Sequence, residues 1–102
     1  FSKIGGEMVP HATVEAALNA ELKLADSDIP LIAVSSRLDE GKGEALVLLA
    51  ATDITLAQAK DALRNAGISN LWQPKYLVKV EKIPLLPSGK LDLKQIAKLA
   101  AG

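Results

Sequence analysis

The fold of this chain is decided by one stretch, Ile83-Pro84-Leu85-Leu86-Pro87-Ser88-Gly89-Lys90, which stands directly before a segment with helical spacing. Its two prolines stiffen the backbone and remove two N–H donors. Ser88-Gly89 supplies a turn with Lys90 at its tip, and Asp92 with Gln95 forms part of a capping box. The pattern predicts a rigid loop, between a strand and a helix, that presents one ammonium group.

Lys90 can also be interpreted simply as a solvated surface lysine. The chain has twelve basic residues, and most of them are expected to be solvated surface. The loop is also not a phosphate-binding P-loop, which needs a glycine six residues before the lysine and Ser or Thr after it. Pro84 and Leu91 occupy those positions. The loop alone therefore does not establish a function for Lys90.

Composition excludes several classes of function. With 102 residues the chain is one domain, and 49% hydrophobic but only 3% aromatic residues predict an aliphatic core. Zero net charge and three aromatic residues argue against a nucleic-acid surface. The chain has no Cys and one His, which argues against disulfides and a transition-metal site. No apolar run reaches the roughly 20 residues of a membrane span.

The chain begins Phe-Ser-Lys, without an initiator Met and within a motif. We therefore expect a piece of a longer protein. No signal peptide is visible, and we expect a cytoplasmic location, with any approach to the inner membrane made by other parts of the full chain.

The first half of the chain predicts an entry hairpin, a helix and two strands. Residues 3–9 are strand-like and interrupted by glycine, and Pro10 suits the first turn of a helix with an apolar stripe. The apolar runs 31–34 and 45–50 are typical of buried strands. The polar turn 39–43 between them predicts a hairpin.

The second half predicts a helix, a strand and a final helix. Thr55 and Gln58 form a capping box, and Gly67 is a C-terminal stop. A strand is expected near 76–82. The last helix is expected to carry its apolar side chains on one side, namely Leu93, Ile96, Ala97 and Ala100. The predicted fold is α+β, a small three-stranded sheet covered by about three helices and preceded by a short hairpin-like segment.

Two motifs at the ends of the chain resemble those of the C-terminal domain of the adenylate-forming superfamily, which includes acyl-CoA synthetases, luciferases and nonribosomal-peptide adenylation domains. Lys3, Gly6 and Val9 match its Lys-x-x-Gly-x-x-Ile/Val element. Pro84 and Ser88-Gly89-Lys90 match its Pro-x-x-x-Ser-Gly-Lys element. Because the motifs occur in order and span nearly the whole chain, together they are far more specific than either alone.

Finer features resemble one subfamily, the bacterial bifunctional acyl-acyl-carrier-protein synthetase/2-acylglycerophosphoethanolamine acyltransferase. These features are the segments 4–9, 42–48 and 84–86. Two positions depart from the wider superfamily, since Thr13 replaces a common Glu and Leu93 a common Arg. Both departures put specific interdomain salt bridges in doubt, and neither touches Lys90.

The resemblance implies that residues 1–102 are the mobile C-terminal domain of an AMP-forming acid–thiol ligase, inactive without its large N-terminal adenylation domain. Lys90 would be the catalytic lysine of acyl-adenylate formation. The substrate-binding residues would be Gly5, Gly6, Ser88 and Gly89, and the first two would line the passage for the acceptor thiol. His11 is interpreted as a surface or capping residue, and Lys3 as a surface or hinge-adjacent charge.

The resemblance also implies the ligands and partners. ATP and Mg²⁺ would be held mainly by the absent large domain, which would also bind the fatty acid. The acceptor would be the phosphopantetheine thiol of acyl carrier protein or of CoA. No nucleic acid is expected, and a membrane only through other domains. The alternative is a non-enzymatic α/β regulatory or binding module, which would need neither Lys90 nor Gly6.

Overall fold

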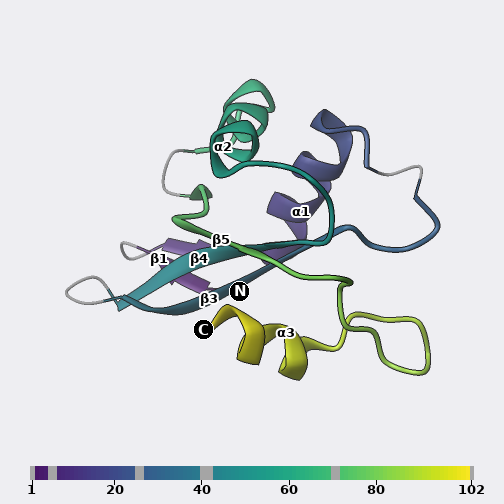
Figure 1. The fold of residues 1–102 in the computed structure, drawn as a ribbon. Helices are drawn as coiled ribbons and strands as arrows, with labels where there is room; N and C mark the ends of the chain where they lie inside the picture. Colours follow the sequence, from purple (N-terminus) through teal and green to yellow (C-terminus); the bar gives the residue numbers. More distant parts are fainter. Residues whose placement is uncertain (1, 5–6, 25–26, 40–42, 70–71, 102) are drawn as a thin grey trace.

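The computed structural model describes residues 2–4, 7–24, 27–39, 43–69 and 72–101. The elements follow the expected order, entry hairpin, helix, two strands, helix, strand and helix (Figure 1). Their bounds are β1 Ser2–Ile4, β2 Glu7–Val9, α1 His11–Glu21, β3 Ile32–Asp39, β4 Gly43–Ala50, α2 Leu56–Asn65, β5 Tyr76–Lys79 and α3 Leu93–Ala100. The prediction of an α+β fold with three helices is confirmed.

Strand β4 is the centre of the sheet. It pairs antiparallel with β3 along its whole length, from Ile32 opposite Ala50 to Asp39 opposite Gly43. On its other side it pairs parallel with β5, and it meets β1 where Ile4 lies opposite Gly43. Strand β2 extends the sheet beyond β1. The three predicted core strands therefore carry the entry hairpin as an attachment to β4.

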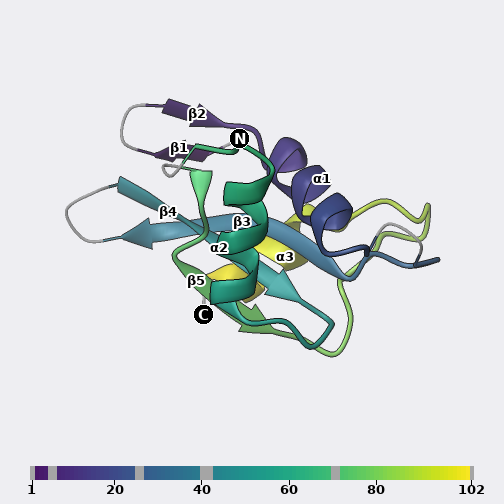
Figure 2. The same cartoon turned by 90° about the horizontal axis from the view of Figure 1, so that it is seen from above.

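Both faces of the sheet are covered by helices, as Figures 1 and 2 show, with α1 and α2 over one face and α3 over the other. Side chains along a strand alternate between the faces. In β4, Leu46 and Leu48 therefore pack into the cluster beneath α1 and α2, while Val47 and Leu49 pack beneath α3. Burial on both faces explains why this strand is a continuous apolar run rather than an alternating one.

The predicted helix ends are largely confirmed. The Thr55 side chain accepts a hydrogen bond from the Gln58 N–H, and the Gln58 side chain accepts one from the Thr55 N–H. Gly67 follows α2 with a φ of +78°, a left-handed conformation suited to glycine. Pro10 is the N-cap of α1, one residue outside the first turn where the sequence placed it.

Three details differ from the sequence-based expectations. Strand β3 continues to Asp39, because its polar second half pairs with β4 although its composition resembles a loop. Strand β5 ends at Lys79, where its pairing with Ala50 ends. In α3 only Ile96 and Ala100 are buried, while Leu93, in the first turn, is 69% exposed.

The edge of β3 is partly closed by a carboxylate from α1. The Glu15 side chain accepts a hydrogen bond of 2.7 Å from the Val34 N–H. Burial raises the pKa of the Glu15 carboxyl, and the hydrogen bond from Val34 partly opposes that rise. An edge strand with open N–H groups is a template for unwanted pairing, so this contact removes one such donor. No helix in the described part of the chain is long and apolar enough to cross a membrane.

Candidate functional site

The loop that carries Lys90 is closed by its own backbone. The Leu86 N–H donates to the Lys90 carbonyl at 2.7 Å, and the Gly89 N–H donates to the Leu86 carbonyl at 2.8 Å. Further out, the Asp92 N–H donates to the Pro84 carbonyl at 3.0 Å. This is a narrow hairpin with a β-turn at its tip, a geometry that Pro87 in the second turn position favours. The predicted rigid loop is therefore present.

Gly89 gives this turn its shape. Its φ is +88°, a conformation that residues with a Cβ rarely adopt. A Cβ added there would meet no neighbouring atom within 4 Å, so the requirement for glycine is conformational and not steric. Asp92 then begins α3, and its side chain accepts a hydrogen bond from the Gln95 N–H at 3.2 Å. The loop is thus anchored directly to a capped helix.

The Lys90 side chain is exposed, and among the described residues nothing forms a hydrogen bond or ion pair with it. Exposed leucines occupy nearby positions, with Leu85 and Leu86 in the same loop and Leu93 at the start of α3. A loop that carries a cation beside exposed apolar side chains is suited to docking on another protein surface. The sequence analysis missed this apolar surface, although the run Leu85-Leu86 in a proline-bounded loop is visible in the sequence.

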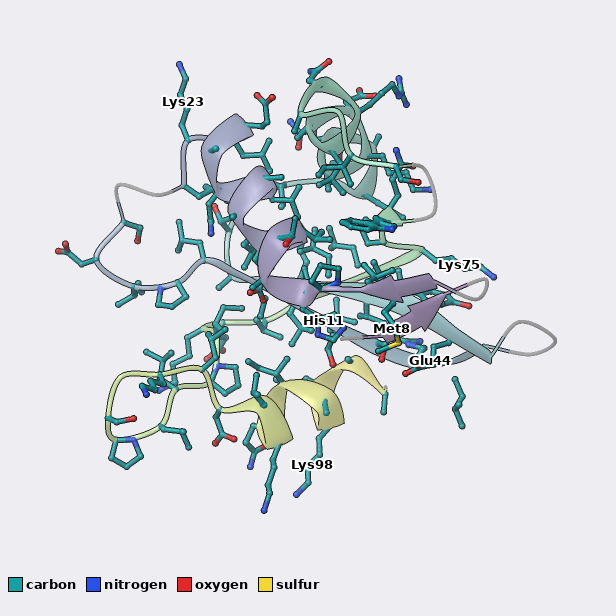
Figure 3. The ribbon with its side chains drawn as sticks, turned by 180° about the vertical axis from the view of Figure 1, so that it is seen from behind. Met8, His11, Lys23, Glu44, Lys75 and Lys98 are labelled. Atoms are coloured by element: carbon teal, nitrogen blue, oxygen red, sulfur yellow. The ribbon has the colours of Figure 1, made fainter. Side chains whose placement is uncertain are left out.

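The first motif lies on the β1–β2 hairpin. Its strands pair antiparallel, with Ser2 opposite Val9 and Ile4 opposite Glu7. Gly5 and Gly6, the predicted thiol-passage residues, lie outside the described residues. Met8 on β2 is 59% exposed, and Figure 3 shows it near His11 and Glu44.

His11 at the start of α1 is half-buried. Burial lowers the pKa of its imidazole, while the Glu44 carboxylate acts in the opposite direction. Glu44 on β4 in turn accepts a hydrogen bond of 3.0 Å from the Ser36 hydroxyl on β3. These groups form a polar cluster at the start of α1, where His11 is half-buried and Pro10 is the N-cap.

The two motifs are not brought together. The β1–β2 hairpin and the Lys90 loop lie at opposite ends of the sheet in both Figure 1 and Figure 2. No three His, Cys, Asp or Glu side chains gather into a possible metal site within the described ranges. This part of the chain therefore offers two separate surfaces, one with a presented ammonium group and one with a glycine-containing hairpin, and not a single enclosed active site.

Comparison with known proteins gives the context for these surfaces. No protein-family model matches the chain. Among curated proteins, bacitracin synthase 3 of Bacillus licheniformis is 31% identical over 96 residues, which is 92% of this chain and 1% of that protein. The chain thus spans a very small part of its curated relative.

Solved structures match over nearly the whole chain. Amide bond synthetase McbA from Marinactinospora thermotolerans has 21% identity and a TM-score of 0.77, with 98% of this chain and 20% of that chain covered. MbtA from Mycobacterium smegmatis has 25% identity and a TM-score of 0.76, covering 94% and 18%. The fatty acyl CoA synthetase of Mycobacterium tuberculosis has 22% identity and a TM-score of 0.75, covering 95% and 19%.

The chain has the fold of these proteins. They are adenylate-forming enzymes, the superfamily that the two motifs resemble. The chain spans about a fifth of the length of each solved relative. The comparisons support the adenylate-forming superfamily as the coarser assignment.

Proposed function

We propose that this chain is the mobile C-terminal domain of an AMP-forming acid–thiol ligase, with Lys90 as its catalytic residue. The observation that carries the proposal is the self-closed loop that holds an exposed ammonium group, in a domain with the fold of adenylate-forming enzymes. In this proposal residues 1–102 lack the large adenylation domain, which would hold ATP, Mg²⁺ and the fatty acid.

Lys90 would act in the first half-reaction, in which a carboxylate attacks the α-phosphorus of ATP and pyrophosphate leaves. Negative charge develops on the α-phosphoryl oxygens in the transition state. A preorganised cation is worth most at that moment. Ser88 and Gly89 would shape the turn that delivers the ammonium group, and Lys suits the task as a compact charge with rotatable donors.

The β1–β2 hairpin would act in the second half-reaction, in which a thiol attacks the acyl-adenylate and AMP leaves. Because the two motifs lie at opposite ends of the sheet, one active site can meet them only in turn. Rotation of the domain against the large domain would withdraw the Lys90 loop and bring Gly5 and Gly6 to the thiol passage. Such gating lets one site serve two reactions.

We further propose that the acceptor is a phosphopantetheine thiol, on acyl carrier protein or on CoA. The subfamily resemblance favours the carrier protein and an associated 2-acylglycerophosphoethanolamine acyltransferase activity elsewhere in the full protein. This finer assignment is supported only by the resemblance of three segments to that subfamily, namely 4–9, 42–48 and 84–86.

Replacement of Lys90 tests the proposal in the intact enzyme. Lys90→Ala should slow adenylate formation, measured by pyrophosphate exchange, by roughly 10²–10³-fold, the scale for loss of one transition-state donor. Thioester formation from preformed acyl-adenylate should be largely retained. Lys94→Ala, an exposed lysine four residues further along, is the matched control and should behave as wild type.

Two outcomes would contradict the proposal. An equal loss in both half-reactions would mean that Lys90 has no step-specific role. Absence of any ATP-dependent chemistry in the intact protein would instead favour the alternative, a regulatory or binding module. Acceptor identity is then settled by offering CoA and the carrier protein separately.

A further inference from the structure

Arg37 is held by two contacts at the end of the sheet where β1 meets β4. Its Nε donates a 2.7 Å hydrogen bond to the carbonyl of Ala100, the last residue of α3. Its guanidinium carbon lies 4.4 Å from the centre of the Tyr76 ring on β5. The side chain therefore bridges β3, β5 and α3, and its flat guanidinium group has little freedom to lose on binding a ligand.

Most of the donors of Arg37 have no partner among the described residues. A guanidinium group has five N–H donors, and the contact with Ala100 uses one. No other hydrogen bond or ion pair joins Arg37 to the described residues, and the residue is partly exposed. Lys75 brings a second cation, 5.7 Å from the centre of the same ring.

This cationic cluster, Arg37 with Lys75 around Tyr76, lies close to the first motif. Arg37 is opposite Ala45 on β4, and Ile4 of β1 is opposite Gly43. Arg37 and Ile4 are therefore two residues apart along the strands and two strands apart across the sheet. With ordinary sheet spacings their backbones are separated by roughly 12 Å. Figure 3 shows Lys75 at this same end of the molecule.

We propose that this cluster binds the phosphate of the phosphopantetheine arm while the thiol enters beside the β1–β2 hairpin. The inference rests on the proposed function. A guanidinium fork matches the geometry of phosphate oxygens, and a charge-assisted contact with a preorganised donor is among the stronger polar interactions. CoA and a carrier protein each contain this phosphate. The site therefore recognises the phosphopantetheine arm and not the rest of the acceptor.

A purely structural role for Arg37 makes a different prediction. A cation at the C-terminus of a helix stabilises the helix through its dipole, and here it also fastens α3 to the sheet. Loss of that role would affect every acceptor equally, whether or not it carries a phosphate. Comparison of acceptors with and without the phosphate therefore separates the two roles.

The experiment uses the intact enzyme with 4′-phosphopantetheine and pantetheine as minimal acceptors. Wild type should prefer the phosphorylated acceptor in kcat/KM, through KM, by roughly tenfold, the scale of one charged hydrogen bond. Arg37→Gln should abolish most of that preference, and Arg37→Lys should restore part of it. Arg64→Gln, at the other arginine of the chain, is the control, because Arg64 lies on α2 in an exposed pair with Asp61 and should retain the preference.

Calorimetric titration with 4′-phosphopantetheine measures the site without turnover. Binding that is roughly tenfold weaker in Arg37→Gln than in wild type supports the site even if no thioester forms, a result that would count against the proposed function alone. The proposed site would be overturned if wild type and Arg37→Gln bound 4′-phosphopantetheine equally. It would also be overturned if Arg37→Gln lost the same fraction of kcat/KM with 4′-phosphopantetheine and with pantetheine. In parallel assays CoA and the holo-carrier protein should both lose affinity in Arg37→Gln wherever they serve as acceptors, because both carry the phosphopantetheine phosphate.

Discussion

The two ends of this sheet are organised differently. At the Lys90 end, residues 84–92 are closed by hydrogen bonds among themselves, and the loop stands alone with exposed leucines around it. At the hairpin end, side chains join separate elements, as when Ser36 donates to Glu44 and Arg37 to Ala100. The first surface is local and self-sufficient, whereas the second is assembled from distant parts of the chain. The difference suits a presented charge on one side and a shaped docking surface on the other.

The strongest test of this contrast is a bulky side chain at Gly6, in the sequence between β1 and β2. Gly6→Leu should lower thioester formation by roughly 10²-fold, because a small misplacement at a reacting centre costs about that much. Pyrophosphate exchange should be spared, since the Lys90 end is untouched. Thermal unfolding must be measured in parallel, and a loss of exchange in a folded protein would show that the two ends are not functionally separate.

A smaller effect is expected from Gly89→Ala at the other end. The φ of +88° should cost roughly 1–2 kcal/mol in a residue with a Cβ, either as lost stability or as a rearranged turn. Because the turn positions Lys90, adenylate formation should fall by about tenfold while transfer to the thiol is retained. Gly89→Asn should be milder, since Asn tolerates this region better. Equal activity in all three proteins would mean that the turn does not position Lys90.

The smallest effect on activity is expected at the edge of β3, between the two ends. Glu15→Ala leaves the Val34 N–H without its partner and should destabilise the domain by about 1–3 kcal/mol. Glu15→Gln keeps an acceptor oxygen and should be close to wild type. Both variants should retain the ratio of the two half-reactions, since the contact is remote from the Lys90 loop. Chemical denaturation of the intact protein measures these changes.

The pH dependence of the same pair has a definite sign. Burial raises the pKa of the Glu15 carboxyl in the folded protein, so the folded state holds this proton more tightly than the unfolded state. The stabilising contribution of protonation is present below the ordinary glutamate pKa and is lost as pH rises through the raised pKa. The stability of Glu15→Gln relative to wild type should therefore increase over that window. A flat difference would show that Glu15 has no raised pKa.

Local signals in the sequence predict local structure well. Thr55 with Gln58, Asp92 with Gln95, and Pro87 before Ser88-Gly89 each specify a cap or turn within a few residues, and each is found as expected. The buried runs of β3 and β4 were likewise recognisable because apolar strands covered on both faces are continuous.

The missed features depend on register between distant segments. The polar half of β3 resembles a loop until its pairing with β4 is known. Arg37 meets Ala100 only because α3 crosses β3, and no spacing in the sequence connects residues so far apart. Leu93 has the right period for the apolar face of α3, but it is 69% exposed, so no other element covers it. Periodicity gives the direction of a side chain and not the extent of the surface that receives it.

The central position of β4 has a kinetic consequence in the proposed cycle. The same strand holds the entry hairpin at Gly43 and β5 at its other end, from Val47 to Ala50, and the Lys90 loop follows β5. Both surfaces therefore move as one body, and occupancy of the active site by one excludes the other. An acceptor that holds the hairpin in place before adenylation becomes a competitor of that step, so a large excess of acceptor should inhibit turnover, and higher ATP should relieve the inhibition.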